Sequence, residues 1–177
     1  MHLKSLLSLL FLQIGFGLAF HQHIKRGGET NATLSAYGTN STNWPIAYGL
    51  LYIAEYPSNS NANLTPLTWD LASITGECWI ANATFVNGTR AGSMYIMPEN
   101  EYAVGVLPIT RIAYLNGTVS GFALFASQLV YNNNTFLEAQ FWAKSTSFTG
   151  VYGLTWTLDD SAPSGDFPVV VKATENS

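Results

Sequence analysis

The chain has 177 residues, of which 47% are hydrophobic and only 10% are charged, and its formal net charge is −4. This acidic balance, with no basic stripe, argues against binding to nucleic acid or to an anionic membrane. The length suits a single domain with a sizeable core rather than two domains.

The first residues have the pattern of a secretion signal. His2 and Lys4 form a short basic region, an apolar stretch covers residues 6–20, and small residues end at Ala19. We therefore expect a signal peptide over residues 1–19, cleaved after Ala19. A membrane anchor is the alternative, but the apolar stretch is shorter than the roughly 20 residues that span a bilayer.

A dibasic pair, Lys25-Arg26, follows this segment and precedes two glycines. Such a pair in a flexible stretch is typical of a processing site in the secretory pathway, which gives a pro-segment over residues 20–26 and one domain over residues 27–177. In the alternative, the pair only keeps a loose N-terminus in solution. Cleavage there would leave four basic side chains against all 11 acidic ones, a net charge of −7, and no histidine.

The segments after residue 45 have the character of strands. They are rich in aromatic and β-branched residues, bounded by Gly, Pro, Asn or Ser, and free of long helical periodicity. The fold class that we expect is therefore all-β, a single-domain antiparallel β-sandwich or related barrel with few or no helices. The expected strands cover residues 46–56, 67–74, 78–86, 93–97, 102–107, 111–115, 119–131, 136–143, 151–158 and 167–172.

Sequons for N-glycosylation recur along the domain and coincide with turn signals. Asn87-Gly88 and Asn116-Gly117 are pairs that suit a two-residue hairpin turn, where a glycan can project into water. Several sequons behind a secretion signal predict a glycoprotein whose glycans supply the solubility that sparse charges do not. The expected sites are Asn31, Asn40, Asn63, Asn82, Asn87, Asn116 and Asn133.

The expected strand over residues 119–131 is apolar on both faces, although a strand in a two-layer sandwich needs only one apolar face. Either it runs through a barrel corner, or a loop, a subunit or a ligand covers its outer face. We expect an interaction face here that would support a weak homo-oligomer or attachment to a partner. Its residues are Ala123, Phe125, Leu129 and Tyr131.

Two strand-like motifs carry a resemblance to a known group of proteins. Residues 47–54 read AYGLLYIA and residues 151–156 read VYGLTW. In these motifs the chain resembles small secreted ascomycete proteins of the cell wall, the spore surface or the host interface, the last including effectors. The resemblance implies a fungal extracellular protein, and it brings no catalytic residue with it. The partners that we expect for such a protein are cell-wall polysaccharide or a host protein.

After cleavage behind Arg26 the chain has no histidine, and the chemistry left is carboxylate chemistry, because catalytic triads and imidazole metal sites need a histidine. If only residues 1–19 were removed, His21 and His23 would remain near the N-terminus and could bind copper, with a flexible pro-segment as the preferred interpretation. We therefore expect no catalytic residue, no metal and no cofactor, in a non-catalytic secreted glycoprotein. The alternative is a small carbohydrate-active enzyme or binding module that uses Glu77 and Glu138 beside Trp79, Phe136 and Phe141. Cys78, the single cysteine, is expected to be a buried thiol, with an intermolecular disulfide as the alternative.

Overall fold

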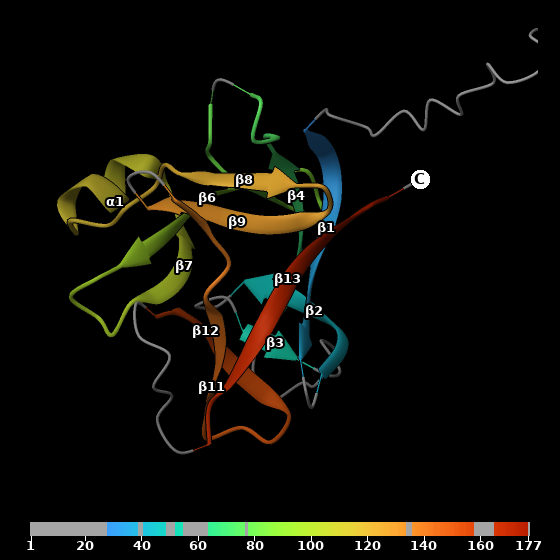
Figure 1. Ribbon diagram of the computed structural model, residues 1–177, viewed down its shortest axis with the longest axis vertical. Coiled ribbons are helices and arrows are strands. Elements are labelled where there is room, and N and C mark those ends of the chain that lie inside the picture. The colour runs from blue at the N-terminus through green and yellow to red at the C-terminus, as the bar shows by residue number, and fades with distance from the viewer. Residues whose placement is uncertain are drawn as a thin grey trace, which may run out of the picture.

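The computed structural model describes residues 28–38, 41–48, 52–54, 64–76, 78–133, 136–157 and 165–176, which form a β-barrel with additional strands (Figure 1). The expected all-β fold is confirmed. The elements are β1 (Glu29–Gly38), β2 (Ser41–Tyr48), β3 (Tyr52–Ala54), β4 (Thr65–Leu71), β5 (Asn82–Phe85), β6 (Arg90–Met97), β7 (Ala103–Leu107), α1 (Ile109–Tyr114), β8 (Phe122–Phe125), β9 (Gln128–Asn133), β10 (Phe136–Glu138), β11 (Phe141–Ser145), β12 (Val151–Trp156) and β13 (Phe167–Glu175).

The barrel closes because its antiparallel strand pairs form a ring. β1 pairs with β13, β13 with β11, β11 with β12, β12 with β3, β3 with β2, and β2 again with β1. A second row, β4 to β7, leaves the ring at β1 and β2 and returns to it at β12. Closure of this kind removes most of the unpaired strand edges that invite aggregation.

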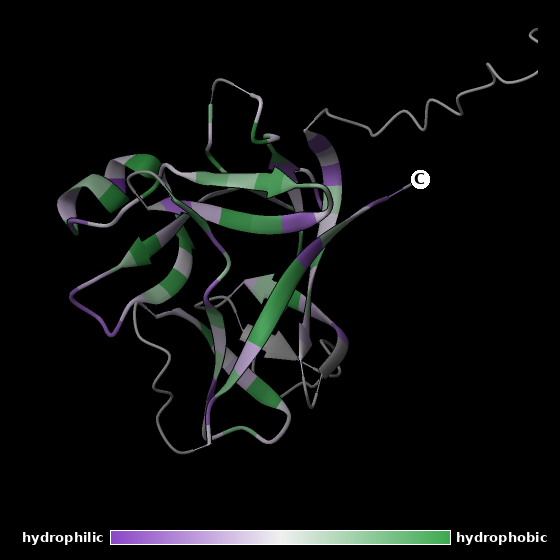
Figure 2. Cartoon of the chain, in the orientation of Figure 1, coloured by the Kyte–Doolittle hydropathy of each residue, from purple (hydrophilic) through white to green (hydrophobic). Residues whose placement is uncertain are grey.

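The core fills the barrel with large apolar side chains, and Figure 2 shows hydrophobic stretches along β8 and in the middle of β9 and β13. Each such side chain stabilises the fold by about 1.5–3 kcal/mol when it is fully buried. Those with almost no exposed surface are Trp69, Phe122, Phe141, Leu34, Ile46, Met94, Ile112, Leu124, Leu129 and Leu154.

The short helix α1 covers the outer face of β6. Tyr95 of β6 lies opposite Gly105 of β7, and a Cβ on Gly105 would come within 2.6 Å of the Tyr95 hydroxyl oxygen. Gly117 leaves similar room for Ile112 and for the same tyrosine ring. Tyr95 is thus packed between two glycines and the buried Ile112 of α1. Among the described residues no helix is both long enough and apolar enough to cross a membrane.

Several expected strands are divided in the structure. Residues 46–56 contribute to β2 and β3, which pair with each other, and residues 136–143 contribute to β10 and β11. Residues 119–131 contain the hairpin of β8 and β9, whose turn lies at Ala126 and Ser127, with Ala126 at φ +55°. Within the described parts of the chain, β1 is an additional strand that the sequence pattern did not indicate. It pairs with β13 along most of its length.

The segment around Asn116 corrects two further expectations. Residues 111–115, expected as a strand, belong mainly to α1, and Asn116-Gly117 ends this helix instead of forming a hairpin. Asn116 adopts φ +51°, and the N–H of Gly117 donates to the carbonyl of Ile112 at 3.4 Å. This is the arrangement of a Schellman-type helix end, in which an asparagine can take the left-handed position.

Candidate functional site

A surface pocket of about 270 Å³ lies where β6 begins and where β7 passes into α1. At this point the backbone of β6 comes close to the end of β7. Gly92 has φ +141°, and a Cβ there would lie 2.4 Å from the carbonyl of Leu107, so a side chain at this position would push the two strands apart. The lining residues are Arg90, Ala91, Gly92, Ser93, Pro108, Ile109 and Thr110.

One of the predicted glycosylation sites, Asn82 on β5, is held by two residues of this pocket. Its Oδ1 accepts a hydrogen bond from the hydroxyl of Ser93 at 2.8 Å and another from Nη2 of Arg90 at 3.2 Å. Ser93 is buried and lies opposite Asn82 in the β5–β6 ladder. The sequence gives no local sign of this arrangement, because the two donors are brought to Asn82 only by strand pairing.

The remaining sequons are distributed over the molecule. Asn31 on β1, Asn87 between β5 and β6, and Asn116 after α1 are all exposed. Asn133 is the last residue of β9, and Asn40 and Asn63 lie outside the described residues. None of the sequon asparagines whose side chains are described is buried.

The turn at Asn87-Gly88 exists, but it is not the two-residue hairpin that we expected. The N–H of Phe85 donates to the carbonyl of Thr89, and the N–H of Gly88 donates to the carbonyl of Phe85, both at 2.8 Å. Only Gly88 of the pair has positive φ, at +83°. The loop therefore has three residues and a glycine in the left-handed position, which is the next most common hairpin connection.

The predicted interaction face is wrong as a continuous surface. Ala123 is 1% exposed and Leu129 is 0% exposed, whereas Phe125 is 57% exposed. The hairpin causes this, because the turn at Ala126 breaks the alternation on which the face depended. Loop residues also cover the edge of β8. The N–H of Leu124 donates a hydrogen bond to the carbonyl of Ala72 at 2.7 Å, and the carbonyl of Leu124 accepts a hydrogen bond from the N–H of Ile74 at 3.1 Å.

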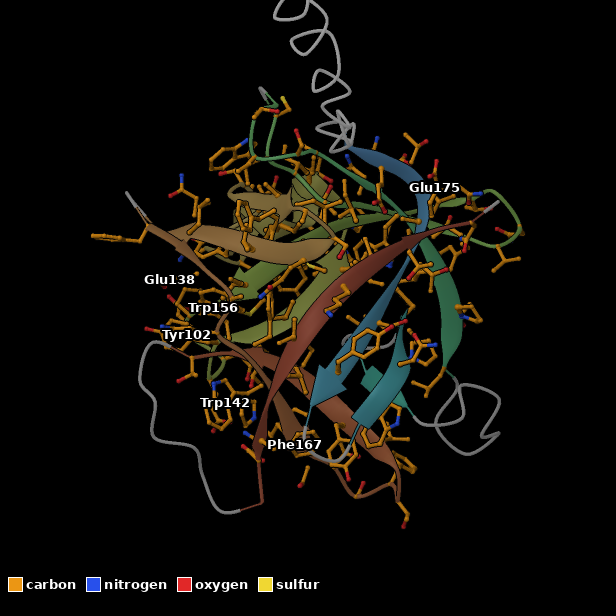
Figure 3. All side chains as sticks on the ribbon, turned by 45° about the vertical axis from the view of Figure 1, so that its right-hand side comes forward. Tyr102, Glu138, Trp142, Trp156, Phe167 and Glu175 are labelled. Carbon is orange, nitrogen blue, oxygen red and sulfur yellow. The ribbon has the colours of Figure 1, made fainter. Side chains whose placement is uncertain are left out.

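The carboxylate alternative can be located only in part, because Glu77 lies outside the described residues. Glu138 is half-buried on β10 and lies opposite Tyr131 of β9. The Tyr131 ring packs edge-on against Trp156 at 5.1 Å between centroids. In Figure 3, Glu138, Tyr102 and Trp156 lie on the same side of the barrel.

The indole N–H of Trp156 is a polar atom that this aromatic cluster leaves unpaired. Its Nε1 is buried and has no hydrogen-bond partner within the described residues. A buried donor without an acceptor costs about 1–3 kcal/mol. Trp156 also packs edge-on against Phe141 at 5.0 Å, so the ring itself is well held.

Other candidate residues are placed as follows. Cys78 is exposed in the loop before β5, which corrects the expectation of a buried thiol in a strand. The expected processing residues Ala19, Lys25 and Arg26 lie outside the described residues. In the part of the chain that the structure describes, no three His, Cys, Asp or Glu side chains are close enough together to hold a metal ion.

Among the described residues, two titratable groups have perturbed pKa values. A hydrogen bond from Lys144, and then its positive charge, lowers the pKa of the exposed Glu101 carboxyl. Burial, with a smaller contribution from Tyr48, raises the pKa of Tyr95. Both perturbations lie in structural contacts, the first between the β6–β7 turn and β11 and the second beneath α1.

Comparison with protein families, with curated proteins and with solved structures found no match.

Proposed function

We propose that this chain is a secreted, N-glycosylated fungal protein that works without catalysis, at the cell wall or spore surface or at the interface with a host. In this proposal the mature protein begins after Arg26, and its partners are wall polysaccharide or a host protein. It takes no cofactor.

The observation that carries this proposal is the exposure of the sequon asparagines. Asn31, Asn87 and Asn116 are exposed, and they lie on a barrel strand, in a hairpin turn and at a helix end. Glycans at such positions extend into water without interrupting strand pairing. They would also supply the solubility that a chain with 10% charged residues lacks.

A second candidate, carbohydrate binding or hydrolysis beside Glu138, is favoured by the unpaired N–H of Trp156. The Trp156 ring packs against Tyr131, whose backbone pairs with Glu138. A buried donor without a partner needs an explanation, and a functional role is one such explanation. Hydrolysis, however, needs a second carboxyl group at a suitable distance from Glu138.

The proposal is tested by expressing the full chain with a C-terminal tag in a filamentous fungus. We expect the tagged protein in the culture filtrate or in washed hyphal and spore walls, with a mass that falls by several glycans after endoglycosidase treatment. Retention inside the cell, or a secreted mass equal to that of the polypeptide, would contradict the proposal.

The second candidate is tested on the same material. Purified protein is incubated with β-glucan and with xylan, beside a Glu138→Gln variant. The proposal expects no hydrolysis by either protein. Hydrolysis by the unsubstituted protein that the Glu138→Gln variant lacks would replace the proposed function with the carbohydrate-active one.

A further inference from the structure

We propose that the pocket beside Asn82 holds the first sugar of the glycan carried by Asn82 itself, so that this glycan is a packed part of the fold. The inference rests on the proposed function, because it requires that the chain is N-glycosylated. It distinguishes Asn82, which is half-buried and bonded to two residues of this pocket, from the exposed sequon asparagines Asn87 and Asn116.

The orientation of the Asn82 amide is the first argument. A guanidinium can only donate hydrogen bonds, so the amide atom that faces Arg90 must be the oxygen. That oxygen also accepts from Ser93, and the two bonds fix the plane of the amide. Nδ2, the atom that carries the sugar in an N-glycan, has no acceptor within the described residues. Glycosylation at Nδ2 therefore leaves both hydrogen bonds intact.

The placement of the sequon on β5 is the second argument. Successive side chains of a strand point to opposite faces, so Asn82 and Thr84 share one face and Ala83 takes the other. Ala83 is buried in the core, while Asn82 and Thr84 are half-buried on the outer side. Asn82 does not itself line the pocket, but Arg90 and Ser93 line it and both bond to the Oδ1 of Asn82. A sugar on Nδ2 would therefore begin next to two lining residues.

The chemistry of the lining is the third argument. An N-acetylhexosamine has one face of C–H groups and a rim of hydroxyl and amide groups. Pro108 and Ile109 offer an apolar surface, and Ile109 is 43% exposed. Thr110 and Arg90 offer polar groups at the same pocket. A sugar seated there would cover the exposed part of Ile109.

A covalent tether gives this occupant an advantage over a free ligand. At about 270 Å³ the pocket is close to the lower end of the roughly 300–1,000 Å³ that is usual for pockets binding free small molecules. A free ligand must also overcome the loss of its translational and rotational freedom. A covalent tether removes most of that cost, because a short link gives an effective concentration on the order of millimolar.

The experiment uses Thr84→Val in the full secreted chain, which removes the sequon but leaves Asn82 and its bonds to Ser93 and Arg90 unchanged. Thr89→Val is the matched control, since it removes the sequon of Asn87 in an exposed turn, where the contact to Asn87 comes from the backbone N–H of residue 89. We expect Thr84→Val to lower Tm by about 3 °C or more and Thr89→Val to leave it nearly unchanged.

Ile109→Ser, made alone and together with Thr84→Val, tests whether the sugar contacts the pocket. We expect Ile109→Ser to lower Tm more in the glycosylated protein than in the Thr84→Val background. Trimming the glycan to its first N-acetylglucosamine should preserve Tm, because only that sugar fills the pocket. Site occupancy is measured by mass spectrometry of the glycopeptides.

The outcomes separate this inference from the proposed function. Glycans on Asn87 and Asn116 with an unmodified Asn82 would overturn the inference and leave the proposed function standing. If Asn82 carries a glycan but the Tm losses of Thr84→Val and Ile109→Ser simply add in the double variant, the inference is also overturned. A secreted chain with no glycan at any sequon would overturn both.

Discussion

Truncation of Leu129 and of Phe125 to alanine tests the β8–β9 hairpin directly. On one continuous strand these two residues, four apart, would share a face and respond alike. In the hairpin, Leu129 lies opposite Leu124 in the core, whereas Phe125 lies opposite Gln128 beside the turn and is exposed. Leu129→Ala should therefore cost about 2–5 kcal/mol in the free energy of unfolding. Phe125→Ala should change it by no more than about 0.5 kcal/mol.

Thermal unfolding followed by tryptophan fluorescence measures both variants. In a domain of this size each kcal/mol shifts Tm by about 2–4 °C, so Leu129→Ala should lose roughly 4–20 °C and Phe125→Ala at most about 2 °C. Leu129→Met, which nearly conserves volume, serves as the control and should fall between them. Equal losses for the two alanine variants would refute the hairpin, as would a larger loss at Phe125.

Three other measurements follow from the structure. Gly92→Ala should destabilise the protein more than Gly88→Ala. Both glycines have positive φ, but only at Gly92 would the new Cβ lie 2.4 Å from a backbone carbonyl. Similar urea midpoints for the two variants would contradict this. Cys78 is exposed, so a thiol reagent should modify it in the native protein at a rate close to that in urea, and strong protection would show that it is covered. Lys144 lowers the pKa of Glu101, so this ion pair stabilises the folded state slightly at any pH above the ordinary pKa of a carboxyl group. That stabilisation is lost as the pH falls through the lowered pKa of Glu101. An NMR titration should find that Lys144→Met raises this pKa, and an unchanged value would exclude the ion pair in solution.

The all-β class could be predicted from the sequence because most strands carry aromatic and β-branched residues between turn residues. β1 could not be predicted as easily. The core-facing residues Ala32, Leu34 and Ala36 alternate along it, but two of the three are alanines, which give a weak hydrophobic signal. β1 is held as a strand by its pairing with β2, β4 and β13, and a local sequence pattern does not indicate such pairing.

Turns account for the errors in strand boundaries. The β8–β9 turn is formed by Ala126 and Ser127, with no Gly, Pro, Asn or Asp to mark it, and Ala126 takes φ +55° under the constraint of the closed hairpin. Asn116-Gly117, by contrast, carries a strong turn signal that both a hairpin and a helix end can use. A helix of six residues is too short to reveal its periodicity in the sequence.

At the candidate site, too, the sequence predicts only what adjacent residues determine. The sequon at Asn82 can be read from three adjacent residues, but its neighbours cannot. Arg90 and Ser93 reach Asn82 through a ladder whose register shifts between Ala83, opposite Gly92, and Thr84, opposite Arg90. Without that shift, Arg90 and Ser93 would not lie on the same side of Asn82, because side chains alternate between faces. The irregularity in the sheet is therefore what brings a charged donor to the amide.

Barrel closure reduces the main hazard of a β-rich chain with few charges, which is association through unpaired strand edges. Closure of the ring pairs most strands on both sides, but β10 pairs only with β9 among the described strands. Natural proteins usually protect such an edge with charged side chains, and β10 supplies only Glu138 beside the exposed Phe136 and Leu137. Within the described strands, β10 is therefore an edge that is only weakly protected against edge-to-edge association.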